Sequence, residues 1–71
     1  MKNELDHSHA DRPTVRLVGA NGNAINILGL CFRAARGAGW SAKRIAAFRA
    51  EATSGDYGYL HAVVRAHFEV K

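Results

Sequence analysis

The chain has 71 residues, one cysteine and a formal net charge of +4, which predicts one small domain without an internal disulfide. No cysteine and histidine set has zinc-site spacing, so we expect no metal and no cofactor. No apolar run approaches the roughly 20 residues of a membrane span, and residues 1–13 lack the apolar core of a signal peptide, which predicts a cytoplasmic protein without a membrane partner.

A domain of this size buries only about 60% of its unfolded surface, so its stability is marginal. Small domains compensate with disulfides, metals or partner subunits. Since the first two are not expected here, we predict a homo-oligomer.

Basic residues dominate the middle of the chain. Between Arg12 and Ala50 there is no acid, and the basic residues there are Arg12, Arg16, Arg33, Arg36, Lys43, Arg44 and Arg49. A block of one sign favours an anionic partner. The alternative is an ordinary solvated surface.

Residues 1–13 are predicted to be a disordered polar tail, and residues 14–71 to be a single small domain. His7 and His9 form an H-x-H pair that could hold a metal weakly, although a solvated tail explains them better. Thr14–Val18 has the alternation of a short strand. The following Asn-Gly pair indicates a turn, in which Asn23 is placed to cap a helix.

The first helix is expected over residues 24–36. Its apolar side is broad, and its polar wedge holds only Asn26, Gly29, Arg33 and Arg36. A helix that is apolar over most of its circumference is central or lies at an interface, which supports the predicted oligomer. Gly37 is the expected left-handed residue that ends this helix.

Two further helices follow. Ser41 is the predicted cap of the second, with Trp40 packed at its entry, and Gly55 is expected to stop it. Ser54 or Asp56 is expected to cap the third, over about residues 57–67. The predicted buried residues are Ile45, Phe48 and Ala52 in the second helix and Leu60, Val63 and Val64 in the third.

Residues 68–71 alternate in polarity and are expected to form a short strand beside Thr14–Val18. The predicted fold is therefore helix-dominated α+β, in the order β-α-α-α-β with a two-stranded sheet. The alternative continues the third helix through residues 68–71 and gives an all-α three-helix domain.

The first candidate ligand-binding site combines the turn Asn21, Gly22 and Asn23 with Arg33 and Arg36. A helix N-terminus attracts phosphate or carboxylate through its free N–H groups. Arginine forks suit the same anions. The alternative is that Asn23 only caps the helix and the arginines only solvate it.

The second candidate is the joint at Asp56 and Tyr57, where Tyr57 could stack on a base. Asp56 and His61 are five residues apart and do not share a helix face, so Asp56 is better explained as a cap. Cys31 lies on the apolar side of its helix and is expected in the core. We therefore expect no catalytic residue and no enzyme.

The chain contains the motifs Gly22-Asn23-Ala24 and Glu51-Ala52-Thr53-Ser54-Gly55-Asp56-Tyr57. Through these motifs it resembles a group of very small proteins encoded in phages, prophages and plasmids. The resemblance covers about residues 14–70. It implies an accessory protein that binds and blocks host machinery, as anti-CRISPRs and signal-nucleotide sponges do. The group follows Gly-Asp-Tyr with an acidic residue and a histidine, whereas this chain has Gly58 and Tyr59.

The predicted function is stoichiometric binding of an anionic ligand or of a nucleic-acid-associated host complex, with anti-defence as the role that the resemblance implies. One alternative is a protein–protein module or a structural subunit that uses the apolar face of helix 24–36. The other is a small DNA-binding protein, since the second and third helices resemble a helix-turn-helix.

Overall fold

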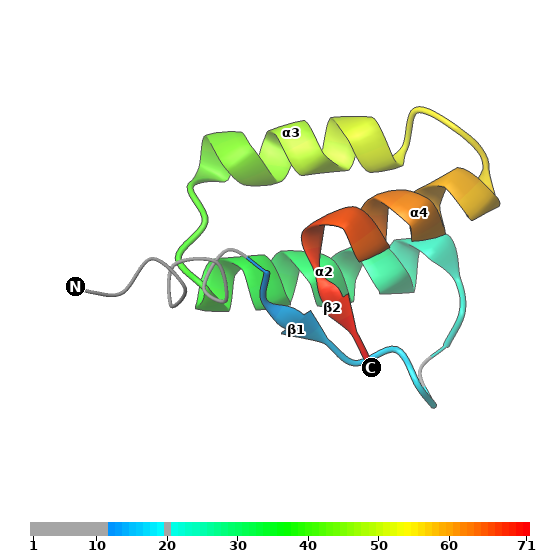
Figure 1. Ribbon diagram of the computed structural model, residues 1–71. Coiled ribbons are helices and arrows are strands. Elements are labelled where there is room, and N and C mark those ends of the chain that lie inside the picture. Colours follow the sequence, from blue (N-terminus) through cyan, green and yellow to red (C-terminus); the bar gives the residue numbers. More distant parts are fainter. Residues whose placement is uncertain (1–11, 20) are drawn as a thin grey trace.

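The computed structural model describes residues 12–19 and 21–71 (Figure 1). The predicted order β-α-α-α-β is confirmed for this part of the chain, so the fold is helix-dominated α+β. Its elements are β1 (Thr14–Val15), α2 (Ala24–Gly37), α3 (Ala42–Ala52), α4 (Tyr57–His67) and β2 (Glu69–Val70). The all-α alternative is wrong, because Glu69 and Val70 pair with β1. His7, His9 and the rest of residues 1–11 lie outside the described residues.

The sheet is parallel, with Thr14 opposite Glu69 and Val15 opposite Val70. Parallel strands need a long crossover connection, and here the three helices provide it. The amide of Glu69 donates to the Pro13 carbonyl at 2.9 Å, and the Arg12 side chain donates to the Phe68 carbonyl at 3.4 Å. Residues 12 and 13 therefore lie against the end of the folded chain.

β1 is shorter than the predicted strand Thr14–Val18. The amides of Leu17 and Val18 both donate to the Lys71 carbonyl, at 2.6 and 3.1 Å. Two donors that converge on one acceptor end the regular ladder, in which each carbonyl meets the next amide in turn. The pairing therefore continues past Val15 only as an irregular contact.

Side-chain caps start all three helices in the described part of the chain. Asn23, Ser41 and Asp56 each accept a hydrogen bond from a backbone N–H two or three residues further on, at 2.8, 3.1 and 2.8 Å. These caps confirm the predicted start of each helix and select Asp56 over Ser54 for α4. The Ser54 hydroxyl instead donates to a carbonyl of the last turn of α3, the Glu51 oxygen, at 2.7 Å.

The end of α2 differs from the prediction at Gly37. Gly37 is still helical, and the left-handed residue is Gly39, with φ +86°. The Trp40 amide donates to the Ala35 carbonyl and the Gly39 amide to the Arg36 carbonyl, both at 3.0 Å. This pair of bonds is a Schellman motif. It forms two residues later than predicted because Trp40, which follows Gly39, is buried in the core and stacks on Phe68.

The core lies where the three helices and the sheet meet, and each helix contacts the other two. Phe68 is fully buried and stacks on Trp40 with ring centres 5.1 Å apart, while Phe48 meets both rings edge-on. Of the predicted core, Ile45 is half-buried and the others are buried, namely Phe48, Ala52, Leu60, Val63 and Val64. Trp40 lies between α2 and α3, and Phe68 directly precedes β2, so their stacked rings connect these three elements in the core.

α2 is largely but not fully covered by its own chain. Ile27, Cys31 and Ala35 are buried, and five further apolar residues of α2 pack partly against the core, namely Ala24, Leu28, Leu30, Phe32 and Ala34. Ile25, near the start of α2, remains 80% exposed. Within residues 12–19 and 21–71, no helix has both the length and the apolar character that crossing a membrane requires.

Candidate functional site

The Asn21–Asn23 turn is closed by its own side chains. The Asn21 carboxamide oxygen accepts from the Asn23 amide at 2.9 Å, and Asn23 caps α2 through Ile25. The Asn26 side chain donates to the Asn21 carbonyl at 2.8 Å. The backbone N–H groups of Asn23 and Ile25 are therefore already used inside the turn, which leaves fewer backbone donors for an anion at this place.

The turn and the predicted Asp56–Tyr57 site, which are far apart in the sequence, meet in the structure. The Tyr57 hydroxyl donates to the Gly22 carbonyl. The Tyr57 ring also meets His61 edge-on, with ring centres 4.6 Å apart. Since Asp56 is engaged as the α4 cap, the polar groups of this junction already have partners within the chain. The junction thus joins α2 to α4 and has a structural explanation.

A pocket of about 240 Å³ lies at this junction, and its lining is mostly apolar: Ala24, Leu28, Ala52, Thr53, Gly55, Asp56, Tyr57 and Leu60. Gly55 is required there, because a Cβ atom at this position would lie 2.7 Å from a ring carbon of Tyr59. This close approach gives a physical reason for the Gly-Asp-Tyr word that is separate from any ligand.

Arg33 and Arg36 are exposed on α2, where they line a shallow hollow of about 410 Å³ with Ile25, Asn26, Gly29 and Leu30. They do not lie beside the Asn21–Asn23 turn. A helix rises about 1.5 Å per residue, so Arg33 is roughly 15 Å along the axis from Asn23. One small anion therefore cannot contact both parts of the first predicted site.

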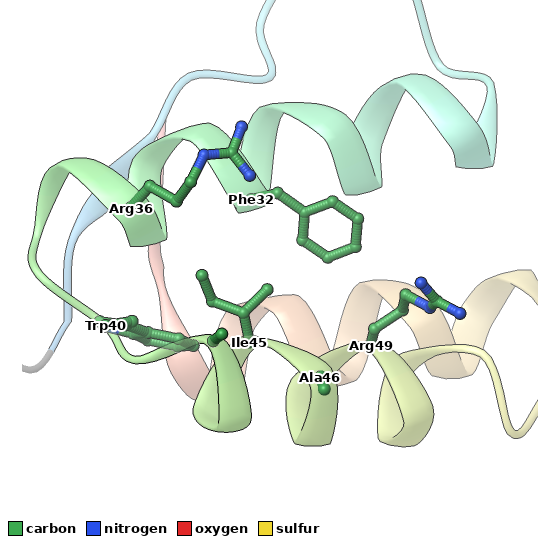
Figure 2. Close-up of a pocket in the computed structure, with 7 residues that line it drawn as sticks. Phe32, Arg36, Trp40, Ile45, Ala46 and Arg49 are labelled. Atoms are coloured by element: carbon green, nitrogen blue, oxygen red, sulfur yellow. The ribbon is translucent and has the colours of Figure 1, made fainter.

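A second hollow, which we call the arginine groove, lies between α2 and α3 and has a volume of about 380 Å³ (Figure 2). α2 contributes Phe32 and Arg36, and Trp40 lies in the connection between the helices. α3 contributes Ala42, Ile45, Ala46 and Arg49. Arg36 therefore lines both this groove and the hollow beside Arg33.

Arg49 belongs to neither of the two sites predicted from the sequence. Ala42, Ile45, Ala46 and Arg49 are spaced i, i+3, i+4 and i+7, so they form one face of α3. This face lies beside the buried residues Phe48 and Ala52. The spacing of these mostly small residues before Arg49 could have indicated an open face of α3. From the sequence, Ile45 is instead predicted to lie on the buried face with Phe48 and Ala52.

Positive charge around the groove is not balanced by acids within the described residues. Across residues 12–19 and 21–71, no carboxylate pairs with Arg36 or Arg49. Glu51 instead pairs with His67, with Nε2 and Oε1 3.0 Å apart, and Asp56 caps α4. As far as the described residues are concerned, the guanidiniums of Arg36 and Arg49 are therefore available to an outside anion.

Metal-ligand clusters and the reactivity of Cys31 bear on the chemistry that the described residues can support. No group of three or more histidine, cysteine or acidic residues gathers as a metal site in residues 12–19 and 21–71. Cys31 is fully buried, as predicted, and this burial raises the pKa of its thiol to about 11. A buried thiol with a raised pKa is a poor nucleophile near neutral pH.

Comparison with known proteins adds no relative: no family model, no curated protein and no solved structure matches this chain significantly.

Proposed function

We propose that this protein acts by stoichiometric binding of an anionic partner through the basic surface of α2 and α3. The observation that carries the proposal is that Arg33, Arg36 and Arg49 are exposed there, while no described carboxylate pairs with them. The setting we propose is a cytoplasmic accessory protein of a phage or plasmid that binds and blocks a host component. The resemblance noted in the sequence supports this setting.

Arginine is well suited to bind an anionic partner, and a surface that only needs to be solvated does not require it. Its planar fork donates two parallel hydrogen bonds to phosphate or carboxylate, and such charge-assisted bonds are about twice as strong as neutral ones. Because the attraction is electrostatic, the affinity for an anionic partner should fall steeply with salt.

The test uses inorganic polyphosphate, a polyanion without rings, as the probe. Binding is measured by calorimetry at about 0.1 M and about 1 M salt, where the screening length is about 10 Å and about 3 Å. We expect binding at the lower salt only. The variant Arg36→Gln/Arg49→Gln should weaken it at least about 10-fold, since a hydrogen bond to a charged group contributes roughly 1.5–3 kcal/mol.

The matched control is Arg16→Gln/Lys71→Gln, which removes the same net charge away from α2 and α3. Equal losses in the two variants would mean that only the total charge matters. No salt-dependent binding of polyphosphate by the natural sequence would refute the proposed function.

A second function, a protein–protein module or homo-oligomer, is favoured by a different observation. Val18 and Ile25 are each 80% exposed, and Tyr57 and Tyr59 are about half exposed. Large exposed apolar residues mark interaction sites where they form a contiguous patch. Sedimentation of the natural sequence and of Ile25→Ser over a range of concentrations tests this function. A monomer throughout would exclude the homo-oligomer.

A further inference from the structure

The arginine groove combines two kinds of wall. Arg36 and Arg49 come from different helices, and in Figure 2 their guanidinium groups lie on either side of the Phe32 ring. Small side chains, Ala42 and Ala46, leave the space between the helices open. A ligand in this groove would therefore meet positive charge and an aromatic ring together.

Phe32 is the ring that the groove offers to a ligand. Trp40 already has Phe68 stacked on it at 5.1 Å and the Arg44 guanidinium carbon 3.9 Å from its ring centre. Phe32, by contrast, is half-buried, and its ring contact among the described residues is a perpendicular one with Phe48, at 6.2 Å. Perpendicular packing of this kind anchors the Phe32 ring without a second ring stacked parallel to it.

The size of the groove restricts the ligand further. Its volume of about 380 Å³ lies at the lower end of the range for small-molecule sites, about 300–1,000 Å³. A lone phosphate would leave the apolar walls at Phe32 and Ile45 uncovered. An apolar peptide segment would cover those walls but leave Arg36 and Arg49 without anions, at a cost in desolvation.

From these observations we propose that the arginine groove binds a nucleoside phosphate, with the base against Phe32 and the phosphate held by Arg36 and Arg49. The inference rests on the proposed function and names its ligand class. A flat base with an attached phosphate satisfies both kinds of wall at once, since arginine forks match phosphate and every base has a face that stacks on an aromatic ring. The source is either a free nucleotide or a single strand.

The test uses the emission of Trp40, the only tryptophan in the chain, which lines the groove. The probes are adenosine monophosphate, an oligothymidylate, an abasic oligomer with the same number of phosphates, and polyglutamate. We expect the oligothymidylate to bind at least about 5-fold more tightly than the abasic oligomer, since stacking of a base on an aromatic residue contributes about a 5- to 150-fold gain in affinity. Binding of adenosine monophosphate by itself would identify a free nucleotide as the source, and a need for the oligomer would identify a strand.

Two variants assign the effect to Phe32. Phe32→Leu should abolish the difference between the oligothymidylate and the abasic oligomer, while polyphosphate binding stays unchanged. Phe32→Tyr keeps an aromatic ring and should retain the tighter binding of the oligothymidylate over the abasic oligomer. Should Phe32→Leu fold poorly, Ala46→Leu fills the groove from an exposed position and is expected to remove the same difference.

The outcomes separate the inference from the proposed function. Equal binding of the oligothymidylate, the abasic oligomer and polyglutamate would overturn the nucleoside phosphate while leaving a general anion-binding function in place. Equal effects of Phe32→Leu and Phe32→Tyr would also overturn it. Failure of every polyanion to bind would instead remove the proposed function on which the inference rests.

Discussion

Replacing Gly39 by alanine tests how the end of α2 is built. Gly39 has φ +86°, a left-handed conformation that costs an L-residue with a side chain roughly 1–2 kcal/mol. A Cβ atom there would meet no atom within 4 Å, so the backbone term should act alone. Because 1 kcal/mol shifts the melting temperature of a domain this small by about 4–8 °C, Gly39→Ala should lower it by roughly 4–16 °C.

Gly37→Ala is the matched control for this prediction. Gly37 lies in the helix, and a Cβ atom there would also meet nothing within 4 Å. Alanine is favoured over glycine in a helix by roughly 0.5–1 kcal/mol, so this variant should raise the melting temperature. Both variants are measured by thermal unfolding followed by circular dichroism. If Gly37→Ala destabilised the protein and Gly39→Ala did not, the left-handed residue would be Gly37, and the Schellman motif described above would be wrong.

Three further predictions concern other contacts, and each is checked by urea unfolding. Tyr57→Phe removes the hydrogen bond to the Gly22 carbonyl and should cost about 0.5–1.5 kcal/mol, and no loss would show that the bond contributes nothing. Gly55→Ala places a Cβ atom against the Tyr59 ring and should cost about 1–3 kcal/mol, part of which Tyr59→Ser should recover in the double variant. Burial raises the pKa of Cys31 from 9.0 to about 11, so the protonated thiol favours the folded state. That contribution is complete below pH 9 and is lost as the pH rises towards 11, by about 2–3 kcal/mol, whereas Cys31→Ala should lack this slope.

Local signals in the sequence predicted the helices well. A cap depends on one side chain and the next few amides, so Asn23 and Ser41 could be identified without knowledge of the rest of the fold, and the third cap could be narrowed to Ser54 or Asp56. Periodicity likewise identified Leu60, Val63 and Val64 as the buried face of α4. Both kinds of signal act within one or two helical turns.

Features that depend on distant contacts were harder to predict. The left-handed residue is Gly39 and not the predicted Gly37, because Trp40 is buried in the core, where Phe68 stacks on it. Nothing in the local pattern distinguishes two glycines that lie two residues apart. The same limit explains why the hydrogen bond between Tyr57 and Gly22, 35 residues apart, was not predicted.

The candidate site changed for the same reason. Arg36 was selected with Arg33 because they share a helix face, but the direction in which Arg36 meets a second helix depends on how α2 packs against α3. That packing brings Arg49 into the same groove. The distance of Arg36 from the Asn21–Asn23 turn instead follows from the rise of α2 along its own axis. Helix spacing predicts neighbours along one helix and carries no information on neighbours across two.

The short parallel pairing of β1 with β2 has a consequence for the order of folding. Joining Val15 to Val70 closes a loop of 55 residues (70 minus 15), and closure of such a loop costs roughly 3.5 kcal/mol of chain entropy before any bond forms. The backbone bonds donated by Leu17, Val18, Glu69 and Lys71 contribute about 1 kcal/mol each, so together they only about offset that cost and leave little net stability for the strand pair by itself. We therefore expect the helices to dock first and the two strands to pair on a core that is already formed. During unfolding the same contacts should open early, so the pairing of β1 with β2 should be present only while the helices are docked.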